Sequence, residues 1–175
     1  MQWSDILSQQ PTLAEIATDK LIKPGVLLVG TLRHDGTPRI SAVEPLVMEG
    51  QLWLSMMGTS MKTRDLRRDR RIVLNSIVTD PQATELKVRG TVHPHDEPAT
   101  QQHYATTVAA ALGWEPVVGH FALFTIDIDD FTYIGYDPDT GGQHVARWPP
   151  SVEYVRPATT PTSLGTPQPV RRLLH

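Results

Sequence analysis

The stretch that decides the fold runs from residue 51 to residue 74 and reads QLWLSMMGTSMKTRDLRRDRRIVL. Residues 51–57 are typical of a strand, Gly58-Thr59 interrupt them, and Ser60 opens a short basic helix that a second strand follows. A helix N-terminus carries unpaired N–H groups and partial positive charge, and Ser60 and Lys62 add a hydroxyl and a full charge. This corner is therefore suited to binding a phosphate group.

The basic residues of this helix also have simpler interpretations. Lys62 and the arginines of 64–71 could form an ordinary solvated helix face, interrupted by Asp65 and Asp69, with intrahelical pairs such as Lys62–Asp65. A nucleic-acid surface is not expected, because no aromatic residue occurs between Trp53 and Tyr104 and the net charge is −3. A protein-interaction domain whose basic helix contacts a partner remains an alternative.

Composition limits the classes of chemistry that the chain can perform. The 175 residues are 39% hydrophobic and 20% charged, as expected of a globular protein, and cysteine is absent. Disulfides, thiol nucleophiles and cysteine-based metal sites are thereby excluded. No apolar run approaches the roughly 20 residues that a membrane-spanning helix needs, and no secretory signal is visible. We expect a cytoplasmic protein that does not associate with membranes.

Hydrophobic periodicity predicts a mainly β protein with a few helices. Pro45 predicts a bend in the second strand, and the sixth strand should shift register near Asp129-Asp130. Because no regular crossover helices separate the strands, we expect an α+β fold built on an antiparallel, six- to seven-stranded β-barrel. We divide the chain into a domain, 1–150, and a Pro/Thr-rich tail, 151–175, irregular at 157–169. The predicted strands are 25–33, 38–47, 51–57, 71–78, 84–93, 120–136 and 143–148, and the helices are 11–21, 60–68 and 97–112.

Three segments together carry a family resemblance. They are Gly30-Thr31-Leu32-Arg33 with Asp35-Gly36-Thr37-Pro38-Arg39-Ile40-Ser41, then Leu52-Trp53-Leu54-Ser55-Met56-Met57, and, about 25 residues after Asp35-Gly36, Ser60-x-Lys62-x-x-x-Leu66-x-x-Asp69. Their order and spacing resemble the pyridoxamine 5'-phosphate oxidase-like, FMN-binding split-barrel family over residues 13–150. The resemblance implies a homodimer of split β-barrels with cofactor at the subunit interface. That cofactor would be FMN or, as in many actinobacterial relatives, the deazaflavin coenzyme F(420).

The resemblance also implies which residues contact the cofactor. Ser41, Ala42, Val43 and Glu44 match positions beside the ring, Ser55 and Met56 lie under it, and Ser60, Met61 and Lys62 surround the phosphate. Glu85 and Lys87 match the region that reaches the ring from the partner subunit, and Trp148 resembles a C-terminal tryptophan of actinobacterial members with the same role. The implied cofactor-binding set is Ser41, Ala42, Val43, Glu44, Ser55, Met56, Ser60, Met61, Lys62, Glu85, Lys87 and Trp148.

Two departures from the family pattern bear on the activity. Oxidases that act on pyridoxamine phosphate carry an arginine where this chain has Met61, and another where it has Ser41. Vitamin B6 oxidation is therefore not expected. Each charge-assisted hydrogen bond is worth about 1.5–3 kcal/mol, so the loss of one arginine should weaken binding of the FMN phosphate. F(420) therefore remains an alternative to FMN.

The sequence names no catalytic side chain. It has no Gly-x-Ser-x-Gly elbow. Because a chain without cysteine has few redox groups of its own, hydride transfer to or from a small organic substrate would have to come from a bound cofactor. A non-catalytic protein of the same fold that binds or stores flavin, haem or another ligand is the alternative. His93 and His95 could face one way and hold metal or haem, but we expect a solvated strand end there and no metal. Trp53 and Trp114 are predicted in the core or at a dimer interface.

Overall fold

The strand patterns of the N-terminal half produce two successive hairpins. The computed structural model describes residues 1–79, 84–149 and 151–170. β1 (Leu27–Leu32) pairs with β2 (Pro38–Val43) around the turn at Gly36, whose φ of 83° favours glycine. β3 (Pro45–Met48) pairs with β4 (Gln51–Met57), and both residues of that turn have positive φ. The predicted strand 38–47 is thus two strands, and the break at Glu44 lies beside the predicted bend at Pro45.

A single long strand joins the two parts of the sheet. β7 (Phe121–Tyr136) pairs, over residues 124–134, with the whole of β6 (Glu85–Pro94). Its first residues also pair with β4, whereas its last residues pair with β8 (Gln143–Trp148). The register shifts where Arg89 faces Asp130 and Gly90 faces Ile128, which leaves Asp129 as an extra residue and confirms the predicted shift.

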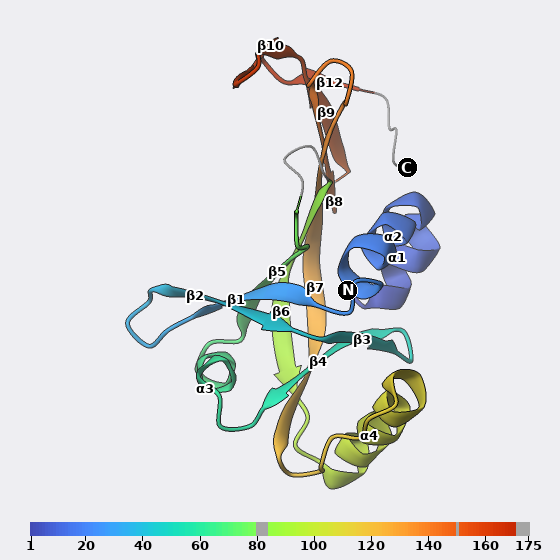
Figure 1. Ribbon diagram of the computed structural model, residues 1–175, viewed down its shortest axis with the longest axis vertical. Helices are drawn as coiled ribbons and strands as arrows, with labels where there is room; N and C mark the ends of the chain where they lie inside the picture. Colours follow the sequence, from blue (N-terminus) through green and yellow to red (C-terminus); the bar gives the residue numbers. More distant parts are fainter. Residues whose placement is uncertain (80–83, 150, 171–175) are drawn as a thin grey trace.

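The sheet closes as a split antiparallel barrel. β5 (Arg71–Asn75) joins β6 to β1, so the described strands run in the order β12-β9-β8-β7-β6-β5-β1-β2, with β4 bridging β3 and β7. The predicted antiparallel α+β fold is therefore confirmed. Figure 1 shows the helices α3 (Met61–Arg68) and α4 (Pro98–Leu112) at one end of the barrel and the C-terminal strands at the other.

Helices seal the barrel on two sides. α1 (Trp3–Gln9), α2 (Pro11–Ala17) and the π-helical turn η1 (Thr18–Ile22) bury an apolar stripe, in which the ring of Trp3 packs edge-on at 6.0 Å from Phe131. α4 forms a smaller second core, because Tyr104 and Val108 pack against Trp53 and Leu123. None of the described helices has the length and apolar character needed to cross a membrane.

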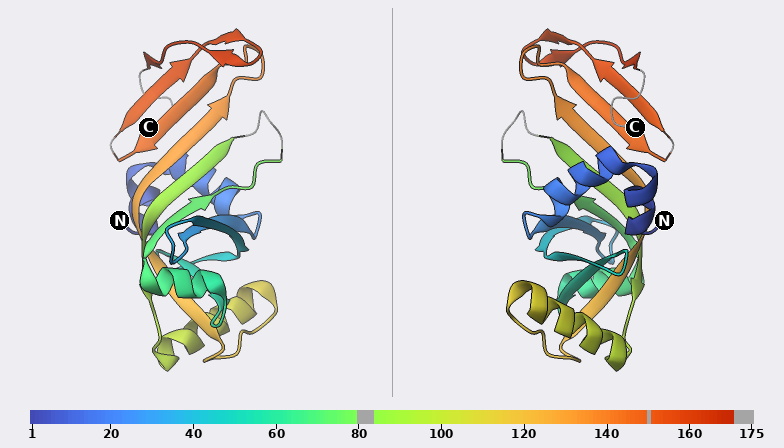
Figure 2. Two further views of the ribbon diagram at one scale, coloured as in Figure 1. Left: turned by 90° about the vertical axis from the view of Figure 1, so that its left-hand side faces the viewer. Right: turned by 90° about the vertical axis from the view of Figure 1, so that its right-hand side faces the viewer.

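The C-terminal segment differs from its prediction. β9 (Val152–Arg156) pairs with β8 over five residues, and β12 (Gln168–Pro169) pairs with β9. A small second sheet forms from β10 (Ala158–Thr160) and β11 (Ser163–Leu164). The expectation that 157–169 is irregular is wrong in part, because β10, β11 and β12 lie in this segment and β12 pairs with the open edge of β9. Figure 2 shows these strands as an arm beyond the barrel; residues 171–175 of the predicted tail lie outside the described residues.

Candidate functional site

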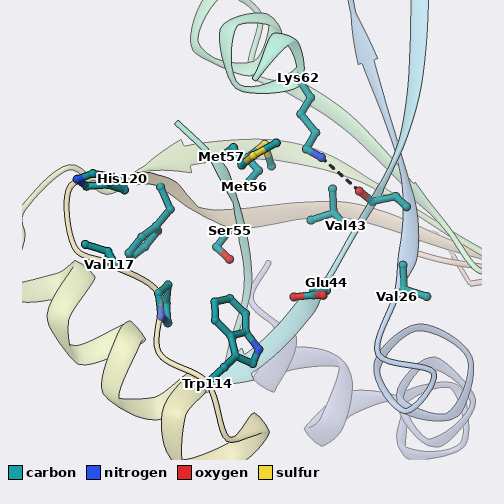
Figure 3. Close-up of a pocket in the computed structure, with 13 residues that line it drawn as sticks. Val26, Val43, Glu44, Ser55, Met56, Met57, Lys62, Trp114, Val117 and His120 are labelled. Atoms are coloured by element: carbon teal, nitrogen blue, oxygen red, sulfur yellow. Dashed lines mark hydrogen bonds between the residues drawn. The ribbon is translucent and has the colours of Figure 1, made fainter. Parts of the chain in front are cut away.

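A pocket of about 500 Å³ opens where the end of β2, the middle of β4 and the first turn of α3 meet. Figure 3 shows Lys62 reaching down from α3, Ser55 and Met56 on β4, and Trp114 on the opposite side of the opening. Six residues of the predicted set line this pocket: Ala42, Val43, Glu44, Ser55, Met56 and Lys62. The structure therefore brings together three segments that lie up to 20 positions apart in the sequence.

The first turn of α3 is fixed by its own capping bonds. Ser60 is the N-cap residue, and its Oγ accepts a hydrogen bond of 3.3 Å from the Thr63 backbone N–H. Thr63 Oγ1 in turn donates to the Met57 carbonyl at 2.9 Å, which ties the helix to the end of β4. Ser60 thus caps the helix, and the Met61 side chain is exposed; neither lines the pocket.

A buried carboxylate anchors the same helix to the sheet. Asp65 is 2% exposed and accepts hydrogen bonds from Thr31 Oγ1 at 3.0 Å and from Arg39 Nε at 2.7 Å. Burial acts to raise the pKa of Asp65, but the bonds from Arg39 and Thr31 and the charges of Arg39 and Arg68 lower it below its ordinary value. The expected intrahelical Lys62–Asp65 pair is therefore replaced by a long-range anchor between α3 and the β1–β2 hairpin.

Lys62 lines the pocket, because Asp65 bonds Thr31 and Arg39 in place of Lys62. Its Nζ donates to the Ala42 carbonyl at 3.3 Å, which holds the ammonium group over the end of β2. Glu44 and Trp114 lie on the other side of the opening. The pocket thus has a cationic end under α3 and an apolar floor that includes Val43 and Met56, and such polarity suits an elongated ligand with an anionic tail.

A buried phenol orients the hydroxyl on the pocket floor. Tyr104 Oη donates to Ser55 Oγ at 3.0 Å, from a position that is 3% exposed. Burial raises the pKa of Tyr104 and the nearby charge of Glu44 adds to that effect, although the bond to Ser55 opposes it. Tyr104 therefore remains a donor near neutral pH, and the Ser55 proton is left for a ligand acceptor.

Sequence reasoning missed the wall formed by the connection between α4 and β7. Trp114 was expected in the core or at an interface, but it lines the pocket and is 46% exposed. Val117 and His120 belong to the same connection, in which Gly113 and Gly119 both have positive φ. The Gly-Trp-Glu-Pro sequence after α4 indicated a turn, but no local signal places that turn against β4.

The remaining predicted residues lie elsewhere in the chain. Ser41 adjoins the pocket on β2 without lining it, and Glu85 pairs with Lys87 at 3.1 Å on β6. Trp148 is 6% exposed and packs 6.3 Å from the ring of Phe131. None of these four lines the pocket of a single chain. The resemblance implies a contact from the partner subunit for Glu85, Lys87 and Trp148 and a place beside the ring for Ser41, and both stay predictions.

The two candidate metal-binding histidines do not converge. His95 Nε2 lies 2.8 Å from Thr125 Oγ1 and its ring packs 4.9 Å from Trp53, whereas His93 is exposed. Within the described residues, no group of three or more His, Cys, Asp or Glu side chains could hold a metal ion.

The basic helix is largely occupied by internal contacts. Arg67 forms a two-pronged ion pair with Asp96, at 3.0 and 2.6 Å, and Arg68 donates to the Leu32 carbonyl. Arg71 pairs with Asp69, and this pairing lowers the pKa of Asp69 to about 2. The guanidinium groups of Arg67 and Arg68 are therefore bonded within the chain, whereas Arg64 makes only a weak contact with Met61.

Comparison with known proteins identifies the fold. No protein-family profile matches the chain, and no curated protein matches it. A NimC/NimA family protein from Clostridium acetobutylicum is 16% identical over 75% of this chain and 93% of its own, with a TM-score of 0.58. An F(420) reductase is 18% identical over 65% and 94%, with a TM-score of 0.54. A general stress protein 26 relative of the pyridoxinephosphate oxidase family, also from Clostridium acetobutylicum, is 18% identical over 75% and 89%, with a TM-score of 0.55. The chain therefore has the pyridoxamine 5'-phosphate oxidase-like split-barrel fold.

The buried anchor yields a stability prediction. Asp65→Asn keeps the shape of the side chain but removes the charge that Arg39 and Thr31 bond, so we expect the free energy of unfolding at pH 7 to fall by about 1.5–3 kcal/mol. Urea unfolding checks this. Because the pKa of Asp65 is lowered on folding, its contribution is present above the unfolded value of about 3.9 and is lost as pH falls through the folded value.

The acid dependence distinguishes the anchor from a general packing defect. The gap in stability between the natural chain and Asp65→Asn should narrow as pH is lowered, since the natural chain then loses its own contribution from Asp65. Asp19→Asn is the control, because Asp19 pairs with Lys20 and Lys23 on the surface and its loss should leave the unfolding midpoint nearly unchanged. A gap that stays constant down to acid pH would contradict the anchor.

Proposed function

We propose that this split barrel is a flavin- or deazaflavin-dependent oxidoreductase of small organic substrates, which binds its cofactor at a homodimer interface. The observation that carries the proposal is the polarity of the pocket: Lys62, in the first turn of α3, forms a cationic end, and Met56 and Val43 belong to an apolar floor. The fold shared with an F(420) reductase and a pyridoxinephosphate oxidase family protein supports the same class of ligand.

The residues present fit such a cofactor. An anionic ribityl tail would be held by Lys62 and by the N–H groups that open α3. A flat ring system would lie against Val43 and Met56, where the Ser55 hydroxyl, oriented by Tyr104, can donate to a ring acceptor. A flavin or deazaflavin bound there supplies hydride transfer, and the chain supplies orientation and an environment shielded from water.

The choice of cofactor rests on the phosphate end. Met61 stands where pyridoxamine-phosphate oxidases have an arginine, and its side chain is exposed and makes a weak contact with Arg64. Lys62 is then the principal cation for the tail. FMN is our first assignment, and F(420), whose longer anionic tail could extend past Met61 toward Arg64, is the alternative.

An apolar strip on the outer sheet face supports the homodimer. Gly30 of β1 lies between Ile40 of β2 and Val73 of β5 in one row, and the two side chains are 73% and 38% exposed. A Cβ at Gly30 would lie 2.5 Å from Val73 Cγ1, so the valine methyl covers this position. Ala42, which lines the pocket, is two residues beyond Ile40 on β2, so a second copy on this strip would adjoin the pocket opening.

Identification of the ligand and its turnover test the proposal. Native mass spectrometry of the purified protein should show FMN or F(420) bound, and NAD(P)H or a small-molecule donor should reduce it under anaerobic conditions. Bound cofactor that no donor reduces and no acceptor oxidises would favour the storage alternative. A colourless protein whose melting temperature rises with neither compound would refute cofactor binding altogether.

Lys62 gives the residue-level prediction. Lys62→Ala should weaken cofactor binding by about 1.5–3 kcal/mol, or roughly 10- to 150-fold in Kd, with little change in the unfolding midpoint. Fluorescence titration with FMN and with F(420) measures the effect. Lys23→Ala is the matched control, because Lys23 is an exposed lysine that pairs with Asp19 outside the pocket. Equal affinities for the Lys62 and Lys23 variants would remove Lys62 from the site.

The proposed interface has its own test. Ile40→Glu combined with Val73→Glu places two charges on the apolar strip, so we expect the dimer to dissociate and cofactor affinity to fall with it. Sedimentation velocity measures the assembly. Leu7→Glu is the control, since Leu7 is an exposed apolar residue on α1, outside the strip. A double variant that sediments as the natural chain does would place the interface elsewhere.

A further inference from the structure

A second cavity lies in the C-terminal arm, at the end of the molecule opposite α3 and α4. It measures about 520 Å³ and is formed by the end of β7, the turn from β7 to β8, the strands β8 and β9, and residues that follow β9. It shares no lining residue with the pocket described above. Its volume lies within the range of small-molecule sites in proteins, which runs from about 300 to 1,000 Å³.

The floor of this cavity is one row of residues across four strands. Gly135, His144, Val155 and Gln168 face one another in register on β7, β8, β9 and β12. A Cβ at Gly135 would collide with the phenol of Tyr133, so this aromatic side chain extends over the glycine. The Tyr133 ring meets the His144 ring edge-on at 5.3 Å. The two rings touch, so together they form one aromatic wall of an open slot, along which a ligand ring can pack.

A buried pair fixes the histidine in this slot. His144 Nε2 lies 2.6 Å from Glu153 Oε1, and the two side chains are 18% and 2% exposed. His144 lines the cavity, whereas Glu153 lies behind it and holds the ring in place. Among the described residues, no hydrogen-bond partner is present for the Tyr133 hydroxyl, which can therefore bond to a ligand.

The rim of the cavity carries two side chains of opposite charge, Arg156 and Asp137. Arg156 uses Nε to bond the Gly165 carbonyl at 3.2 Å, and its terminal nitrogens have no partner among the described residues. The other charged residue of the lining, Asp137, accepts bonds from the backbone N–H groups of Asp139 and Thr140. Asp137 is therefore bonded within its own turn, whereas the terminal nitrogens of Arg156 are available to an anionic ligand.

We propose that the arm cavity binds a small aromatic carboxylate. The ring packs over His144 and Val155 beside Tyr133, and the carboxylate meets the terminal nitrogens of Arg156 in a two-pronged contact. A hydroxyl or amino substituent on the ring bonds the free Tyr133 hydroxyl. The site is independent of the barrel pocket and does not require the proposed cofactor.

The test uses 4-hydroxybenzoate as the probe and the neutral 4-hydroxybenzamide as its matched compound. Titration of the full chain as purified, followed by amide chemical shifts, should give a Kd on the order of 0.1–1 mM for the acid, as suits about ten non-hydrogen atoms. The amide should bind at least roughly tenfold more weakly, because it lacks the charge that Arg156 recognises. The shifts should centre on Gly135, His144 and Val155.

Three variants separate recognition from loss of structure. Arg156→Gln should weaken the acid by roughly tenfold, and Tyr133→Phe by several-fold without lowering the melting temperature, because its hydroxyl has no partner within the described chain. Arg70→Gln, an equal loss of charge on an exposed residue outside the cavity, should leave the Kd unchanged. If Arg156→Gln disorders the arm, as a loss of the Gly165 amide signal would reveal, the Kd of the Tyr133→Phe variant still tests whether the acid binds in this cavity.

Three results would overturn the assignment. They are equal affinity for the acid and the amide, equal weakening by the Arg70 and Arg156 variants, and shifts centred on Ser55 and Met56, which would place the probe in the barrel pocket instead.

Discussion

The buried carboxylate of Asp65 is the contact on which the candidate site depends. It bonds Thr31 of β1 and Arg39 of β2, and so attaches a helix of only eight residues to a hairpin. A helix this short has little intrinsic stability, so its position must come from tertiary contacts. Removing Arg39 alone would leave the buried carboxylate of Asp65 without its ion-pair partner, which costs more than the intact pair contributes. The position of Lys62 is therefore fixed by an acid three residues further along the chain.

The second constraint is that β7 belongs to both parts of the sheet. Its first residues pair with β4 under the barrel pocket, and its last residues pair with β8 in the arm. The extra residue at Asp129 turns the strand between the two, and Asp130 beside it bonds both Arg89 and Arg147. Gly90 of β6 lets the backbone of β7 come close at this bulge, because a Cβ at residue 90 would lie 2.5 Å from the Asp127 carbonyl oxygen.

Local patterns predicted most of the strands because alternation and turn residues act over a few positions. Gly36, Pro45 and the Asp129-Asp130 pair each mark a feature that the structure contains. The site was only partly predictable, since its residues depend on distant partners. The local sequence predicts that Asp65 pairs with Lys62, but Asp65 bonds Thr31 and Arg39, which lie 34 and 26 positions away. Trp114 lacks any periodic signal, and the proline-rich composition after residue 149 concealed the alternation of β9.

The two cavities share a strand, but this does not make them communicate. Phe121, at the start of β7, lines the barrel pocket, and Tyr133, Gly135 and Tyr136, near its end, line the arm cavity. Coupling would require an element with two arrangements that ligands could bias. Between the cavities β7 instead pairs continuously with β6 on either side of a fixed bulge, and Asp130 is held from two sides by arginines. Such a strand supports both sites rigidly, so each must be explained by the residues that surround it.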